Sequence, residues 1–225
     1  YINCLDQAAV LADVMGDTDK AESYRETAAT AREAWNEFFI DPDTGKTKNT
    51  KGEIQDTQAS YATPLRFHVV SDENLEKVLE NYNATIAEAS GEDSDGMPIV
   101  PYTLTTGFNA TGNLLNALSD YGLNDTAYKL FESTDYASWL YPVTQGATSI
   151  WERWNGYTNE LGFNGNNSMN SFNHYSLGAV YEWMVAYQLG IKSDETQPGY
   201  QHFILQPTVG GDFTEAKGSY DSVYG

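Results

Sequence analysis

One carboxylate stands between two indoles in the segment Trp151-Glu152-Arg153-Trp154. Flat apolar rings suit the apolar face of a sugar, and a carboxylate beside them can take a proton from water. This combination is the local chemistry of an enzyme that hydrolyses glycosidic bonds. The same residues also fit a buried tryptophan pair beside an ion pair of Glu152 with Arg153, because most tryptophans only anchor a core.

A long polar stretch follows this segment, from Asn155 to Ser171. Its 17 residues include six Asn and three Gly. A loop of this length inside a compact domain is usually functional or disordered. It leads to His174 at the expected start of a helix. There the ring can donate a hydrogen bond to a sugar hydroxyl or simply fill the turn, and the histidine alone does not separate the two alternatives.

Two further loops carry residues suited to the same pocket. Gly107 and Phe108 precede the helix expected at 109–121, and Trp139 precedes the Glu152 segment. Loops on a rigid scaffold often hold binding residues, so these side chains can supply stacking and hydrogen-bonding groups to one site. A tight turn at Gly107 and a core anchor at Trp139 are the alternatives.

Other catalytic chemistries lack their motifs. The sequence contains no Gly-x-Ser-x-Gly elbow, no phosphate-binding loop and no His-Glu-x-x-His motif. His68, His174 and His202 are far apart and lack metal-ligand spacing. We therefore expect neither a metal nor a cofactor.

The elements that must position these residues are mainly helices. Apolar residues at steps of three and four form continuous stripes, and Gly, Asp and Thr mark the helix ends. The expected helices are one ending at Gly16, one with the stripe Tyr24, Ala28, Ala31, Trp35 and Phe38, one at 57–70, one from Ser71 with Leu75, Val78, Leu79, Tyr82 and Ile86 on one face, two at about 109–121 and 125–133, and one with Leu177, Val180, Met184 and Tyr187 that stops at Gly190. Such paired helices form an array of α/α hairpins.

The pattern changes after Gly190. Residues 203–207 and 216–225 are typical of short strands with turns. We therefore place a domain boundary between the helical residues 1–195 and a β region at 196–225.

Acidic residues dominate the charge of the chain. Twelve Lys and Arg residues face 32 Asp and Glu residues, which gives a net charge of −20. Such a surface repels phosphate backbones and anionic lipids, and no apolar run approaches the length of a membrane span. We expect no nucleic-acid or membrane partner, whereas a neutral substrate is compatible with this charge.

Several separated motifs carry a resemblance to a known family. They are Thr106-Gly-Phe108, Leu114-Leu-Asn-Ala-Leu-Ser-Asp-Tyr-Gly122, Ser138-Trp-Leu-Tyr141, Gln145-Gly-Ala-Thr-Ser-Ile-Trp-Glu-Arg-Trp-Asn155, Ser171-Phe-Asn-His-Tyr-Ser-Leu-Gly-Ala-Val180 and Ser219-Tyr-Asp-Ser-Val-Tyr-Gly225. In this order they resemble the bacterial α-L-rhamnosidases of glycoside hydrolase family 78. The resemblance covers most of the chain from about Thr57 onward.

The resemblance implies an (α/α)6 barrel followed by a β-sandwich, and hydrolysis of a terminal α-L-rhamnosyl linkage with inversion. In such enzymes the Glu of the Trp-Glu-x-Trp motif is the general base, which maps to Glu152. The residues expected to bind the rhamnoside, from the resemblance and from the loops above, are His174, Trp139, Trp151, Trp154, Gly107 and Phe108.

One part of the family pattern is missing from this sequence. The family's general acid lies in an acidic motif with Arg and Trp, and neither Asp56-Thr-Gln58 nor Asp93-Ser-Asp95 has that context. Seven helices are readable, whereas an (α/α)6 barrel has twelve. An inverting glycosidase needs both an acid and a base. We therefore expect the barrel to be incomplete in this chain, and activity to need the N-terminal remainder of the same protein.

Two other functions remain open at this point. The chain could be a non-catalytic carbohydrate-binding fragment that keeps the aromatic pocket, or part of another (α/α)6-barrel glycosidase with a different sugar specificity. The aglycone, the linkage position and the cellular compartment are not specified by the sequence.

Overall fold

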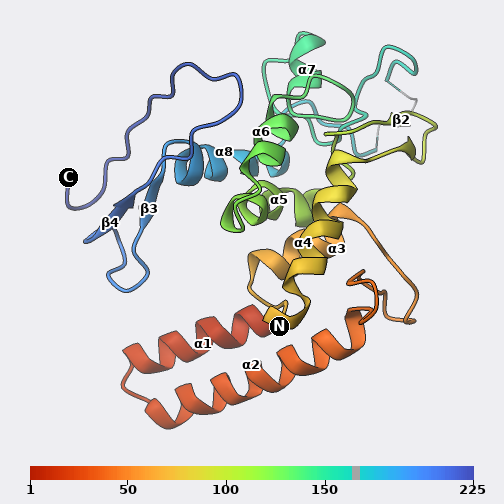
Figure 1. The fold of residues 1–225 in the computed structure, drawn as a ribbon. Coiled ribbons are helices and arrows are strands. Elements are labelled where there is room, and N and C mark those ends of the chain that lie inside the picture. Colours follow the sequence, from red (N-terminus) through yellow and green to blue (C-terminus); the bar gives the residue numbers. More distant parts are fainter. Residues whose placement is uncertain (164–167) are drawn as a thin grey trace. The chain divides into compact units, whose positions relative to one another are not determined.

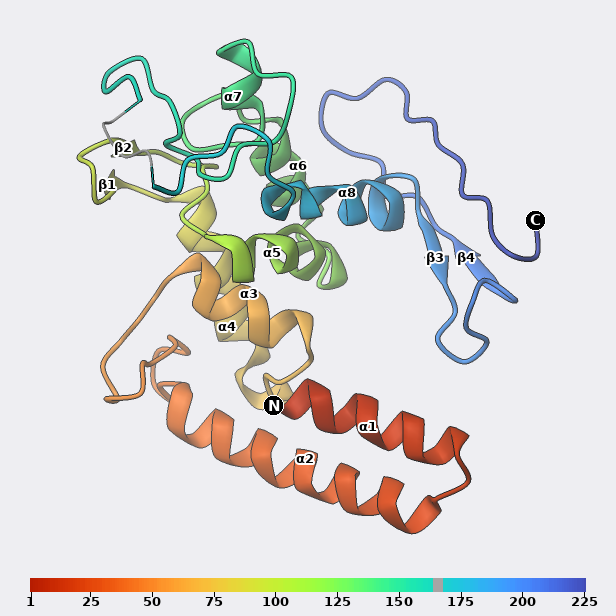
Figure 2. The ribbon, with the colours of Figure 1, turned by 180° about the vertical axis from the view of Figure 1, so that it is seen from behind.

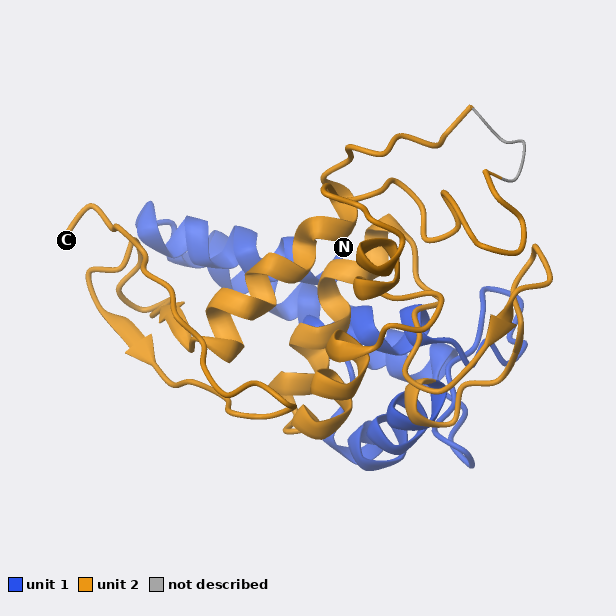
Figure 3. Ribbon diagram, turned by 90° about the horizontal axis from the view of Figure 1, so that it is seen from above, with its two compact units in different colours: residues 1–85 blue, residues 86–225 orange. Residues whose placement is uncertain are grey.

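The structure is a computed structural model that describes residues 1–163 and 168–225. The chain divides into two compact units, residues 1–85 and residues 86–225, which are coloured separately in Figure 3. Helices are the main regular elements of both units, and the strands are short (Figure 1). Among the described residues, no helix is long and apolar enough to cross a membrane.

The first unit opens with the hairpin of α1 (Ile2–Val14) and α2 (Thr18–Phe39), which lie side by side in both views (Figures 1 and 2). Gly16 makes the turn with a φ of +78°, and the side chain of Asp17 caps α2 by accepting from the Lys20 amide at 3.3 Å. The buried residues along the hairpin are mostly alanines, namely Ala9, Ala12, Ala21 and Ala28. Such small side chains let two helices approach closely.

The predicted apolar stripe on α2 is wrong at its last position. Phe38 is 49% exposed, and Phe39 instead stacks on Trp35 with ring centroids 5.7 Å apart. Alternating steps of four and three residues have a period of 3.5, which is shorter than the 3.6 residues of an α-helical turn. Two heptads after Tyr24 the stripe has therefore drifted off the buried face.

Two more helices complete the helical part of this unit, α3 (Gln58–Arg66) and α4 (Asp72–Ala87). Thr57 and Ser60 form a reciprocal capping box at the start of α3. Tyr61 of α3 and Tyr82 of α4 are fully buried with ring centroids 6.2 Å apart. The helix predicted at 57–70 is therefore present but ends four residues early.

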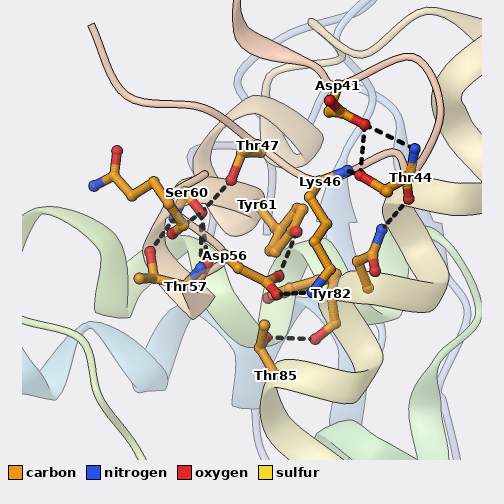
Figure 4. A network of polar contacts seen from close by, with 12 residues as sticks. Asp41, Thr44, Lys46, Thr47, Asp56, Thr57, Ser60, Tyr61, Tyr82 and Thr85 are labelled. Carbon is orange, nitrogen blue, oxygen red and sulfur yellow. Dashed lines mark hydrogen bonds and ion pairs between the residues drawn. The ribbon is translucent and has the colours of Figure 1, made fainter. Parts of the chain in front are cut away.

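Polar contacts organise the connection between α2 and α3 (Figure 4). Asp41 accepts from the Thr44 amide at 2.9 Å, and the Gly45 amide donates to the Asp41 carbonyl at 2.8 Å. The Asp56 carboxylate accepts from the Tyr61 hydroxyl at 2.6 Å and pairs with Lys46. Nowhere in residues 1–163 and 168–225 do three or more His, Cys, Asp or Glu side chains gather to hold a metal ion.

The second unit begins with a small antiparallel hairpin of β1 (Gly91–Glu92) and β2 (Pro98–Ile99). Its helices are α5 (Phe108–Asp120), α6 (Asn124–Glu132), the short α7 (Leu140–Thr144) and a run from Ser176 to Gln188. That run is built from a 3₁₀ turn at Ser176–Ala179, α8 (Val180–Trp183) and a π-helical turn at Met184–Gln188.

The core of the second unit lies where α5 packs against α6 and against the run 176–188. Leu114, Leu118, Leu130 and Trp183 are all at most 1% exposed there. The helices predicted at 109–121, at 125–133 and up to Gly190 are confirmed to within one or two residues. The sequence analysis missed α7, whose five residues are too few to show an apolar period.

A second antiparallel hairpin follows, made of β3 (Ile191–Ser193) and β4 (Phe203–Leu205), with Ile191 opposite Leu205. The strand predicted at 203–207 is confirmed, whereas the strands predicted at 216–225 are wrong because that segment is exposed and pairs with no described strand. The hairpin straddles the proposed boundary between residues 195 and 196, which stays a prediction.

Candidate active site

Two segments far apart in the sequence run antiparallel to each other and build the site. The Glu152 amide donates to the Ser171 carbonyl at 2.9 Å, and the His174 amide donates to the Ile150 carbonyl at 2.8 Å. These backbone hydrogen bonds bring Glu152 and His174 together across the long polar stretch. Of that stretch, residues 164–167 lie outside the described residues.

The two oxygens of the Glu152 carboxylate have different surroundings. Oε2 accepts from the Ser171 amide at 2.7 Å, whereas Oε1 lies 4.0 Å from Nε2 of His174. A separation of 4.0 Å is too long for a hydrogen bond. The backbone therefore fixes one oxygen. The other receives no hydrogen bond from residues 1–163 and 168–225, so it can accept a proton or a hydrogen bond from a small molecule.

His174 presents its Nε2 to this free oxygen. Its Nδ1 accepts from the Ser176 amide at 3.2 Å, so the neutral ring carries its proton on Nε2. The Phe108 ring stacks on the imidazole with centroids 4.9 Å apart and planes 10° apart, and Tyr175 stacks at 5.2 Å. The ring is thus oriented by one backbone contact and two aromatic contacts.

Glu152 lies on the wall of a cavity of about 500 Å³ in the second unit. This volume falls in the range of small-molecule sites. The lining residues are Asp93, Ser94, Pro98 and Ile99 of the β1–β2 hairpin, Thr103 to Phe108, Tyr136 and Ala137, Glu152 to Asn155, and Leu177. Gly107, Phe108, Glu152 and Trp154 therefore line one cavity. His174 is not among its lining residues and contacts one of them, Phe108. Their binding of a sugar stays a prediction.

The three tryptophans do not share this cavity. Trp154 lines it and donates from Nε1 to the Thr106 carbonyl at 2.7 Å. Trp139 and Trp151 are each 7% exposed and line a separate hollow of about 260 Å³, which Trp154 also borders. The Trp139 Nε1 donates to the Leu177 carbonyl at 2.9 Å, a buried contact of the kind that a core anchor makes.

Trp139 and Trp151 pack against residues that neighbour the site. The Trp139 ring meets the Trp154 ring edge-on with centroids 5.8 Å apart, and Trp151 packs edge-on against Phe172 at 5.1 Å. These contacts fix the segments on either side of Glu152. The ion pair of Glu152 with Arg153 does not form, since Nε and Nη2 of Arg153 are buried with no hydrogen-bond partner among the described residues.

Asp93 and Tyr136 are lining residues that the sequence analysis did not select. Their side chains bond to each other at 2.7 Å although 43 residues separate them. The acidic pair Asp93 and Asp95 was visible in the sequence, but nothing in the spacing pointed to Tyr136 as its partner.

Both parts of the chain match known domains. Residues 1–187 match the family model of the bacterial alpha-L-rhamnosidase 6 hairpin glycosidase domain, and residues 190–225 match that of the bacterial alpha-L-rhamnosidase C-terminal domain. The chain belongs to the bacterial α-L-rhamnosidase family. Its mainly helical fold, with a small sheet near the C-terminal end, is thereby confirmed as that of the family's (α/α)6 barrel.

Curated members of this rhamnosidase family include proteins from Streptomyces avermitilis, 33% identical over 225 residues, and from Formosa agariphila, 35% identical over 218 residues. The matches cover 100% and 96% of this chain but only 20% and 21% of those proteins. This chain therefore spans about a fifth of the length of these relatives.

Solved rhamnosidase structures superpose well on this chain. The Streptomyces avermitilis α-L-rhamnosidase complexed with L-rhamnose has a TM-score of 0.79 at 33% identity and covers 94% of this chain and 18% of its own. The native enzyme from Aspergillus terreus has a TM-score of 0.79 at 27% identity, with coverages of 94% and 22%.

Proposed function

We propose that this chain is the part of an inverting α-L-rhamnosidase that supplies the general base, Glu152. The observation that carries the proposal is the asymmetry of the Glu152 carboxylate. Oε2 is held by the Ser171 amide, Oε1 receives no hydrogen bond from the described residues, and Glu152 lines a ligand-sized cavity. A base must be held in place and yet keep one oxygen available for a proton.

In this mechanism Oε1 of Glu152 removes a proton from a water molecule. The water oxygen attacks the anomeric carbon of rhamnose from the side opposite the leaving group, and a general acid protonates the leaving oxygen. Inverting enzymes hold the two carboxyl groups roughly 6.5–9.5 Å apart, which leaves room for the water. The general acid is proposed to lie outside residues 1–225.

His174 binds the sugar in this proposal. Its Nε2 proton points toward Oε1 of Glu152 across a gap of 4.0 Å, so a sugar hydroxyl or the attacking water can contact both groups. Trp154 and Phe108 supply apolar faces on the same cavity wall. Trp139 and Trp151 act by positioning Trp154 and the Glu152 segment.

The family membership and the Streptomyces avermitilis structure, which is complexed with L-rhamnose, support rhamnose as the sugar. We also propose that residues 1–195 form the C-terminal portion of the barrel and residues 196–225 the start of the β-sandwich domain. The N-terminal remainder of the same protein would then complete the barrel.

The test is Glu152→Gln in the protein at the full length of its relatives. Gln keeps the shape and the contact with the Ser171 amide but cannot take a proton. We expect turnover of an aryl α-L-rhamnoside to fall by roughly 10²- to 10⁴-fold, the usual contribution of general base catalysis. Glu160→Gln is the matched control, because Glu160 is exposed and does not line the cavity.

Activity of Glu152→Gln within a few-fold of the unmodified protein would remove Glu152 from the reaction. Calorimetry with L-rhamnose distinguishes an enzyme from a non-catalytic carbohydrate-binding protein. Binding without any turnover in the unmodified protein would support a carbohydrate-binding role instead.

A further inference from the structure

The β1–β2 hairpin brings a carboxylate to the cavity that the proposed reaction does not use. Asp93 accepts on Oδ1 from the amides of Asp95 and Met97, both at 2.9 Å, and on Oδ2 from the Tyr136 hydroxyl at 2.7 Å. All three contacts use the carboxylate as an acceptor. Asp93 is therefore arranged to receive hydrogen bonds and not to deliver a proton.

A second contact fixes this hairpin relative to the base. The Asn155 side-chain amide donates to the Asp95 carboxylate, and Asn155 directly follows Trp154. The hairpin is thus tied both to Tyr136 and to the segment that carries Glu152. Asp93 therefore holds a defined place on the cavity wall, with Asp95 next to the lining residue Asn155.

The Tyr136 hydroxyl has only one proton, and that proton points to Asp93. Burial, followed by the hydrogen bond and the negative charge of Asp93, raises the pKa of Tyr136 well above its usual value. The phenol therefore stays protonated at any ordinary working pH. What the pair can still offer to a ligand is acceptor lone pairs, so the ligand group must be a donor.

The hydroxyl groups of a neutral sugar meet this requirement. An anionic group fits less well, because three carboxylates, those of Asp93, Asp95 and Glu152, gather at this cavity or at its rim against one lining cation, Arg153, whose Nε and Nη2 are buried. The cavity of about 500 Å³ is in the range that accommodates drug-sized ligands, and a single sugar ring next to Glu152 would not fill it. We expect a second sugar ring in this cavity to contact the part of the wall that the β1–β2 hairpin forms.

We propose that Asp93 and Tyr136 are specificity-determining residues that bind hydroxyl groups of a neutral leaving sugar. This inference rests on the proposed function, since it assigns the second part of the same cavity. It names the preferred substrate class as rhamnosides whose leaving group is itself an uncharged sugar.

The first experiment is Tyr136→Phe in the full-length protein, assayed on two substrates. One is 4-nitrophenyl α-L-rhamnoside, and the other is a rhamnosyl-glucose disaccharide. Because one hydrogen bond is lost, we expect a roughly 3- to 10-fold higher KM for the disaccharide. The kcat and the KM for the aryl substrate should each change by less than about twofold. Asp93→Asn, which keeps the size of the side chain, should show the same selectivity if Tyr136→Phe does not fold.

The matched control is Tyr187→Phe. The Tyr187 hydroxyl also donates to an aspartate, Asp120, but neither residue lines this cavity. We expect this variant to lose some stability and to keep the KM of both substrates. An equal change on the two substrates with Tyr136→Phe, or no change on either, would overturn the inference.

A binding measurement decides the inference even where hydrolysis fails. Calorimetry on Glu152→Gln, with and without Tyr136→Phe, should show disaccharide binding weakened by roughly 3- to 10-fold and L-rhamnose binding unchanged. Equal disaccharide affinities would contradict the role of the pair. If the unmodified protein hydrolyses neither substrate, the proposed function fails, and the calorimetric comparison still tests the hairpin.

Discussion

Among the single residues of the site, Glu152 is the most informative, because its two carboxylate oxygens make different contacts. The Ser171 amide holds one oxygen, and the other faces Nε2 of His174 across 4.0 Å. Both residues were selected from the sequence by their neighbours, and their roles stay predictions. The sequence did not reveal this orientation, because the hydrogen bond comes from a backbone amide 19 residues away.

Phe108 is expected to act through His174, and Phe108→Leu tests this. Leu keeps the apolar character but removes the parallel ring contact at 4.9 Å. Aromatic pairs contribute about 0.5–1.5 kcal/mol beyond burial, so we expect kcat on an aryl α-L-rhamnoside to fall by roughly 2- to 10-fold.

Phe213→Leu is the control for this variant, because Phe213 stacks on Phe131 and lines no part of the cavity that holds Glu152. Unchanged turnover in Phe108→Leu would mean that the Ser176 amide alone orients the imidazole.

Residue types alone did not predict the placement of the tryptophans or the bond between Asp93 and Tyr136. An indole that faces a sugar and an indole that anchors a core have the same sequence signal, and only burial separates Trp154 from Trp139 and Trp151. The bond between Asp93 and Tyr136 depends on how a hairpin and a loop are folded together, which no local pattern encodes.

At the scale of elements, the long helices were predictable because a buried face repeats through every turn. Val78 and Tyr82 of α4 are fully buried, as their spacing predicted. Two short elements, α7 and β3, were missed because they contain too few residues to show a period, whereas the equally short β4 was predicted from its apolar run before Pro207. The segment 216–225 has strand-forming residues but lacks a partner strand, and pairing rather than propensity decides whether a strand forms.

The end of the helical run at Gly190 gives a stability prediction. Gly190 has a φ of +74°, and a Cβ there would lie 2.1 Å from the Gln206 carbonyl carbon. Gly190→Ala therefore combines a left-handed backbone, which costs about 1–2 kcal/mol, with overpacking, which costs about 1–3 kcal/mol. We expect a clearly lower midpoint of thermal unfolding.

Gly16→Ala is the matched control, because Gly16 has a φ of +78° with nothing within 4 Å of an added Cβ. It should lower the midpoint less, by the backbone cost alone. Equal shifts in the two variants would show that the close approach of Gly190 to Gln206 is not rigid.

At the scale of the whole molecule, this chain spans about a fifth of its curated relatives, with 20% and 21% coverage. Val10, Leu11 and Val14 of α1, and Met15 directly after it, are all more than half exposed. Large exposed apolar patches usually mark contact surfaces.

We propose that Glu152 activates water for attack on the face opposite the leaving group. Proton NMR of the first product released from an α-L-rhamnoside by the full-length protein tests this role. We predict that β-L-rhamnose appears first and then equilibrates with the α-anomer. Initial release of α-L-rhamnose would contradict the account, because retention requires a carboxylate that attacks the sugar itself.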